Sequence, residues 1–160
     1  MIRTSLLLAL AILLGSCDLF GEGCLYDEVG CDLPGDWQLV SIDGATATGR
    51  WEIAEGFVDR SGYGDLPTGN EQFPRMRGPF ESNYSLNEDR PQGFDLIFWS
   101  MSVAQGTVYM DLAGRVESLD GDRMVYVVIR PDAELIFSGG GSVPLGFPTL
   151  SPGTRLTFER

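Results

Sequence analysis

The 160-residue sequence contains no histidine and no lysine, and all 11 of its basic residues are arginine. Without histidine, Ser–His and Cys–His nucleophile pairs cannot form, and the commonest metal ligand is missing. Without lysine, Schiff-base chemistry is excluded. The 23 Asp and Glu residues give a formal net charge of −12, which opposes binding to nucleic acids and anionic lipid headgroups. Because histidine and lysine are missing, we expect no metal and no cofactor.

Long hydrophobic runs are also absent. The longest is Leu6 to Leu14, and a bilayer span takes ~20 apolar residues. This run follows a basic start and precedes the small residues Gly15 and Ser16, an order typical of a secretory signal peptide. We therefore expect residues 1–16 to be removed after export.

The sequence Leu14-Gly15-Ser16-Cys17 resembles the lipobox of bacterial lipoproteins. The resemblance implies cleavage between Ser16 and Cys17, acylation of Cys17 with palmitate-type chains, and anchoring to a membrane of the bacterial cell envelope. The alternative is an ordinary secretory signal followed by an unmodified cysteine. Asp18 resembles the inner-membrane retention signal of enterobacterial lipoproteins, which would place the domain on the inner membrane, facing the periplasm.

Cysteines are few, at positions 17, 24 and 31, and an odd number in an oxidising compartment leaves one thiol unpaired. Lipidation of Cys17 would account for the odd one. Cys24 and Cys31 would then close a short loop, a disulfide that contributes ~2 to 3 kcal/mol in the chain-entropy treatment, or remain two free thiols. Residues 17–34 are acidic and contain several glycines, so we expect a tether between membrane and domain.

Residues 35–160 have the pattern of an all-β domain, because short apolar runs alternate with Gly, Pro, Asp and Asn and no helical period is present. We expect a single antiparallel meander of about eight strands, forming a small barrel or sandwich. The expected strands are 37–42, 50–58, 80–86, 94–103, 107–118, 123–130, 134–138 and 154–159. Residues 59–79 and 139–153 are expected to be long loops.

Three turns set the expected register of the middle strands: Ala104-Gln105-Gly106, Asp120-Gly121 and Pro131-Asp132-Ala133. The register aligns aliphatic side chains on one inner face and leaves an unusually apolar outer face. This outer set comprises Ile97, Trp99, Met101, Tyr109, Met124, Tyr126, Val128 and Ile136. It is either covered by residues 59–79 of the same chain or exposed as a docking face for a protein partner.

Charged residues give few candidates for chemistry. Arg75 and Arg77 lie in the first expected loop and could hold an anion or an acidic partner, or pair within the chain. A carboxylate pair of the glycosidase type remains possible by number alone. However, the expected register turns the strand acids outward and sets Asp111 opposite Arg130. We therefore expect no enzyme.

The opening Gly35-Asp36-Trp37 resembles the Gly-x-Trp first strand of lipocalins and of small lipocalin-like bacterial domains. The closing Arg155-Leu156-Thr157-Phe158 is similar to their last strand. The resemblance implies that Trp37 plugs the base of an eight-stranded barrel and that Arg155 packs across its ring. It also implies a small apolar ligand inside the barrel, although the lipocalin Thr-Asp-Tyr motif is not evident here.

These observations favour a lipid-anchored, non-enzymatic envelope lipoprotein that acts as a binding or assembly module. A lipocalin-like carrier of a small apolar ligand is one alternative. A periplasmic inhibitor or partner subunit that docks through the apolar outer face is another. A packed barrel interior would count against the carrier, and burial of Trp99 would count against the docking face.

Overall fold

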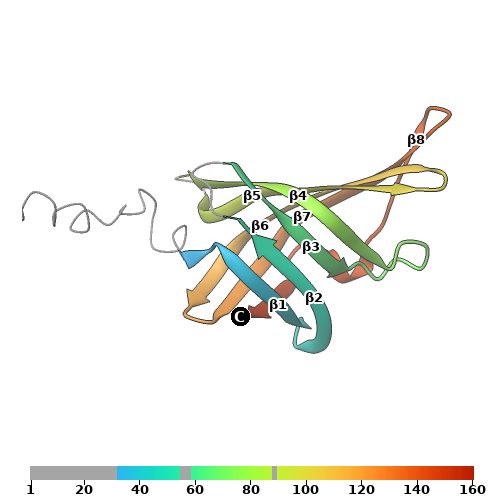
Figure 1. The fold of residues 1–160 in the computed structure, drawn as a ribbon. Coiled ribbons are helices and arrows are strands. Elements are labelled where there is room, and N and C mark those ends of the chain that lie inside the picture. Colours follow the sequence, from blue (N-terminus) through green and yellow to red (C-terminus); the bar gives the residue numbers. More distant parts are fainter. Residues whose placement is uncertain (1–31, 55–58, 88–89) are drawn as a thin grey trace, which may run out of the picture.

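The computed structural model describes residues 32–54, 59–87 and 90–160, and the side chains of all of these except 59–60, 83–87 and 90–98. The described chain is all-β and forms one antiparallel sheet, as the sequence predicted (Figure 1). Its nine strands are β1 (Gly35–Ile42), β2 (Ala45–Ile53), β3 (Asp59–Pro67), β4 (Arg75–Asn87), β5 (Arg90–Val103), β6 (Gly106–Asp120), β7 (Arg123–Phe137), β8 (Ser142–Pro144) and β9 (Arg155–Glu159).

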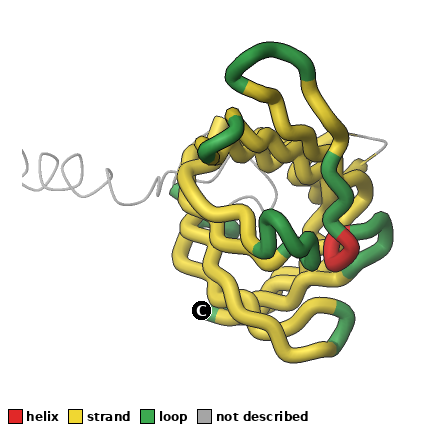
Figure 2. The backbone as a smooth tube through the Cα atoms, turned by 90° about the vertical axis from the view of Figure 1, so that its right-hand side faces the viewer, coloured by secondary structure: helices red, strands yellow, loops and turns green. Residues whose placement is uncertain are grey.

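Eight of these strands close a ring. The sheet order is β6-β5-β4-β3-β2-β1-β9-β7-β8, and β6 also pairs with β7, so the short strand β8 lies outside the closed part. Figure 2 shows the ring. The predicted meander of about eight strands in a small barrel is therefore confirmed. The β5–β6 and β7–β8 hairpins project beyond the ring at the upper right of Figure 1.

Residues 59–79 are not the long loop that their glycines and prolines predicted, because they form β3 and the start of β4. The glycines are needed inside the barrel. A Cβ atom on Gly64 would lie 2.3 Å from Cζ2 of Trp99, and one on Gly114 would lie 2.3 Å from Cζ of Tyr126. Strand glycines therefore make room for large aromatic rings, at a cost in strand propensity.

The expected loop 139–153 is also partly structured. It contains β8 and a turn of 3-10 helix, Pro148–Leu150, drawn in red at the rim of the ring in Figure 2. Thr149 Oγ1 donates to the carbonyl oxygen of Pro67 at 2.9 Å, which ties this segment to the turn after β3. Phe73, Phe147 and Leu150 from the two segments are buried in the core. This end of the barrel is therefore covered.

In two hairpins, the turn is displaced by one residue from the position that the sequence predicted. The β5–β6 turn consists of residues 104–105, because Val103 pairs with Gly106. The β6–β7 turn consists of residues 121–122, and bulges in β6 shift the pairing further along. A shift of one residue exchanges the two faces of a strand. The expected inner and outer faces are therefore reversed in β5 at Trp99 and in β7 up to Val128. At the end of β7, Leu135 is buried and Ile136 exposed, as predicted, and Met110, Leu112 and Val116 of β6 are buried as predicted.

The third expected turn, at Pro131-Asp132-Ala133, does not exist. β7 runs straight through it to Phe137, and Pro131 lies opposite Leu112 of β6. On its other side, β7 pairs with β9 up to Val127 and with β8 from Glu134. Pro131 lies between the segments of β7 that pair with β9 and with β8. It is tolerated there because no strand on that side requires a hydrogen bond from a backbone N–H, which proline lacks.

An aromatic cluster of Trp51, Phe80, Trp99, Tyr126 and Phe158 packs in the middle of the barrel. Trp51 lies at its centre, with ring centroids 4.5 Å from Phe158, 5.1 Å from Tyr126 and 6.1 Å from Trp99. Such ring pairs contribute ~0.5 to 1.5 kcal/mol beyond the burial of their area. The buried indole N–H groups of Trp51 and Trp99 have no hydrogen-bond acceptor among the described residues.

Candidate functional site

Trp37 is fully buried where the first strand enters the barrel. Its Nε1 donates to the carbonyl oxygen of Leu33 at 2.9 Å, and the guanidinium carbon of Arg160 lies 4.3 Å from the ring centroid. The Arg160 guanidinium also donates to the carbonyl oxygens of Asp32 and Gly121, both at 3.0 Å. An arginine therefore closes the base over Trp37 by a cation–π contact.

Arg155 does not make this contact, so the predicted Trp37–Arg155 pair is wrong. Gln38 pairs with Glu159 in the β1–β9 ladder, which sets Trp37 opposite the next residue, Arg160. Arg155 lies further along β9, where its Nη2 is 2.7 Å from the Glu117 carboxylate. The type of residue was predicted correctly, but the register decides which arginine it is.

The predicted apolar docking face is also wrong. Trp99, Tyr126 and Val128 are at most 1% exposed, and Met124 is fully buried with them in the core. Met101 and Tyr109 are half-buried, Ile136 is exposed, and the side chain of Ile97 lies outside the described residues. The reversed faces of β5 at Trp99 and of β7 up to Val128 explain this result, because side chains assigned to the outside point into the barrel.

The predicted sites at Ser16, Cys17, Cys24 and Cys31 lie outside the described residues. The structure therefore adds nothing to the cleavage site, the lipidation site or the disulfide. Each of them stays a prediction from the sequence.

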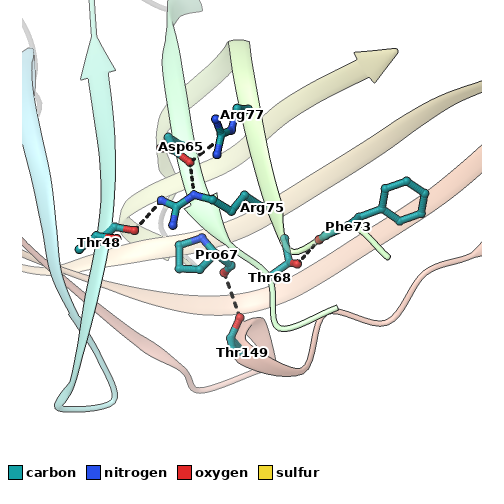
Figure 3. A network of polar contacts seen from close by, with 8 residues as sticks. All are labelled: Thr48, Asp65, Pro67, Thr68, Phe73, Arg75, Arg77 and Thr149. Atoms are coloured by element: carbon teal, nitrogen blue, oxygen red, sulfur yellow. Dashed lines mark hydrogen bonds and ion pairs between the residues drawn. The ribbon is translucent and has the colours of Figure 1, made fainter. Parts of the chain in front are cut away.

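Arg75 belongs to a polar network between β2, β3 and β4 (Figure 3). Its Nε donates to Asp65 Oδ1 at 2.6 Å, and its Nη2 donates to the carbonyl oxygen of Thr48 at 2.6 Å. The Nε of Arg77 lies 4.0 Å from the same carboxylate oxygen, and its side chain is 58% exposed. Of the two possible roles for these arginines, pairing within the chain therefore holds for Arg75, whereas Arg77 remains open to solvent.

A depression of about 450 Å³ lies beside these arginines, and we name it the arginine cleft. β4 and β5 pair between residues 80–87 of β4 and residues 90–99 of β5. Residues 75–79 of β4 and 100–103 of β5 do not pair with each other, so a gap opens between them. Residues that line the cleft include Gln72, Phe73, Arg75, Arg77, Met101 and Val103.

This cleft was not predicted from the sequence, because Arg75 and Arg77 were expected in a loop and not on a strand. A signal was present in Gly78-Pro79. Gly78 adopts φ 144°, a backbone conformation that favours glycine, and Pro79 has no N–H for a neighbouring strand. The pair lies directly before Phe80, where pairing with β5 begins.

A second depression, of about 500 Å³, lies on the outer face of β6, β7 and β8, and we name it the acidic groove. Its lining includes Tyr109, Asp111, Asp132 and Glu134. Asp111 pairs with Asp132 across the strands rather than with Arg130 as predicted, because the register is shifted. Arg130 instead contacts the carboxylate of Asp132 at 2.7 Å.

The pKa of Asp111 is raised above its ordinary value. Partial burial is the main cause, and the nearby Asp132 and Glu134 carboxylates act in the same direction, against the attraction of Arg130. Burial and like charges both disfavour the ionised form of a carboxyl group. The acidic groove therefore brings together carboxyl groups whose proximity and burial disfavour the ionised form of Asp111.

No protein-family model, curated protein or solved structure matches this chain. Within the described ranges, no three carboxylates or thiols are arranged to hold a metal ion. The same part of the chain has no helix long and apolar enough to cross a membrane. The arginine cleft and the acidic groove are depressions formed by described residues, and they are the candidate binding sites.

Proposed function

We propose that the chain is a lipid-anchored, non-enzymatic lipoprotein of the bacterial cell envelope, whose barrel binds a ligand or partner on its outer wall. The observation that supports surface binding is the packing of the described side chains in the barrel interior. The aromatic cluster occupies the middle of the barrel, Arg160 covers Trp37 at one end, and Phe147 and Leu150 are buried at the other.

The alternative of a lipocalin-like carrier draws no support from this packing. A small-molecule pocket of ~300 Å³ or more needs open space and a few polar groups to orient the ligand. Here Trp99 and Tyr126 already occupy the space that Gly64 and Gly114 leave free. The outer wall, in contrast, has two depressions of suitable size.

The proposed anchor rests on the lipobox-like sequence Leu14-Gly15-Ser16-Cys17. After loss of residues 1–16, which include Arg3, 10 basic residues would face 23 acidic ones, a net charge of −13. Such a charge repels anionic headgroups, so acyl chains would have to hold the protein on the membrane. Two chains on one cysteine are enough for stable attachment.

Metabolic labelling with an alkyne analogue of palmitate, followed by carbonate washing of the membranes, tests the proposed anchor. We expect the wild-type chain to take up label and to remain with the washed membranes. Cys17→Ala should take up none and be released. Cys24→Ala is the matched control, since it removes a thiol but leaves the lipobox intact, and it should behave as the wild type. Membrane retention of Cys17→Ala, or no label in the wild type, would contradict the anchor.

A further inference from the structure

The arginine cleft combines a cationic rim with an apolar floor. The floor includes Phe73, which is 5% exposed, and the half-buried side chains of Met101 and Val103. Methionine is flexible and polarisable, and it suits binding surfaces that adapt to an apolar chain. The volume of about 450 Å³ falls within the ~300 to 1,000 Å³ typical of small-molecule sites. The cleft therefore fits a small ligand better than a folded partner.

The rim carries more positive than negative charge. Arg75 and Arg77 share the single carboxylate of Asp65, which leaves a local excess of one positive charge. The guanidinium group of Arg75 is fixed in place, because its Nε donates to Asp65 and its Nη2 donates to the carbonyl oxygen of Thr48. Among the described residues, Arg77 has an ion pair only with Asp65, at 4.0 Å, and its side chain is 58% exposed, so its guanidinium donors remain accessible to a ligand. A guanidinium group matches the two oxygens of a carboxylate.

The rest of the chain limits the charge of the ligand. With 23 acidic residues against 11 basic ones, the protein repels any molecule with several negative charges. A local excess of one positive charge suits one anionic head group. An apolar tail on that head group would cover Met101 and Val103 and remove their surface from water.

We propose that the arginine cleft binds a single-chain anionic amphiphile of the medium-chain carboxylate class. Arg77 contacts the carboxylate, and the alkyl chain lies along Met101 and Val103 toward Phe73. This inference rests on the proposed function, because it names the ligand class for binding on the outer wall.

Titration calorimetry with octanoate tests the inference. The full chain is reconstituted in nanodiscs of zwitterionic lipid if it takes up palmitate label and is kept in buffer if it does not, with empty nanodiscs or buffer as the blank. Octanol supplies the same tail without charge, and acetate supplies the head group without the tail. Arg77→Gln removes the cation, and Arg123→Gln is the matched control, because it removes one charge from a strand end that does not line the cleft. Met101→Gln tests the apolar floor.

We expect octanoate to bind more tightly than octanol or acetate. Arg77→Gln should weaken octanoate binding about three- to fivefold, the effect of losing one exposed ion pair, and leave octanol binding unchanged. Met101→Gln should weaken both. Arg123→Gln should change neither, and Arg77→Lys should restore part of the octanoate affinity. Absence of octanoate binding above the blank, or equal octanoate affinity in Arg77→Gln and Arg123→Gln, would overturn the inference.

The outcome is separable from that of the proposed anchor. Octanoate binding reports on the cleft, whereas palmitate labelling reports on Cys17. Labelled protein without octanoate binding would overturn the ligand class alone. Octanoate binding by a chain that takes up no label would overturn the anchor and leave the cleft in place. Circular dichroism of Arg77→Gln identifies a folding defect, in which case the Arg77→Lys and Met101→Gln results decide.

Discussion

Replacing Gly64 with alanine should destabilise the barrel, because the added methyl group would collide with Trp99. The new Cβ atom would lie 2.3 Å from Cζ2, 2.5 Å from Nε1 and 2.6 Å from Cε2 of the indole. The indole has little room to move, since its ring centroid is 5.4 Å from that of Phe80 and 6.1 Å from that of Trp51. Backbone and rings would therefore have to shift together.

Overpacking of a well-filled core costs ~1 to 3 kcal/mol, and a collision with three ring atoms places Gly64→Ala at the upper part of this range, about 2 to 3 kcal/mol. With an m value of ~2 kcal/mol/M, the urea midpoint should fall by about 1 to 1.5 M. Equilibrium urea unfolding followed by far-UV circular dichroism measures this shift. Gly146→Ala is the matched control, because nothing lies within 4 Å of its added Cβ, and it should stay within ~0.5 kcal/mol of the wild type.

A double-mutant cycle identifies the cause. Trp99→Leu removes all three colliding atoms and should by itself cost ~2 to 5 kcal/mol through the cavity that it leaves. If the collision is real, Gly64→Ala should cost less in the Trp99→Leu background, with a coupling of ~1 to 2 kcal/mol. The reasoning is refuted if Gly64→Ala is as stable as Gly146→Ala, or if the two costs add without coupling.

Two further predictions concern the base of the barrel and the acidic groove. Arg160→Gln should lower the free energy of unfolding by ~1 to 2 kcal/mol, because it removes the cation over Trp37. Arg155→Gln should cost less than ~1 kcal/mol, since it breaks an exposed ion pair, and the opposite ranking in urea unfolding would contradict the assignment. Asp111→Asn should stabilise the protein at neutral pH, because the raised pKa means that folding disfavours the ionised carboxyl. The gain should disappear below the ordinary pKa of 3.8, where Asp111 is protonated in both states, and a gain that persisted in acid would contradict this cause.

The strand content was readable from the sequence because strand formation depends on local patterns. Alternating apolar residues and turn-forming residues indicated an all-β meander of about eight strands. The number agrees with the closed ring, although β3 was not among the expected strands and the expected strand 134–138 is the end of β7. The same local signals failed for residues 59–79. Their glycines disfavour strands by propensity, but Gly64 is required by a ring from β5, a residue 35 positions later in the chain.

The register was beyond sequence reasoning for a related reason. The choice between a two-residue and a three-residue turn at residues 104–106 costs little locally, yet it decides whether Trp99 points into the barrel or into solvent. The candidate site depended on the same choice. Arg77 was noted for its charge, but the apolar floor at Met101 and Val103 became visible only once β4 and β5 were seen to separate.

The sequence by itself determined the exclusion of histidine- and lysine-based chemistry, the acidic character of the chain, and the lipobox-like start, because these follow from residue type and order. The tertiary structure decided that an aromatic cluster packs in the middle of the barrel, that Arg160 rather than Arg155 covers Trp37, and that a cleft lies beside Arg77. Closure of the ring requires every strand to satisfy two neighbours at once. That requirement fixes register and packing over distances that no local pattern in the sequence encodes.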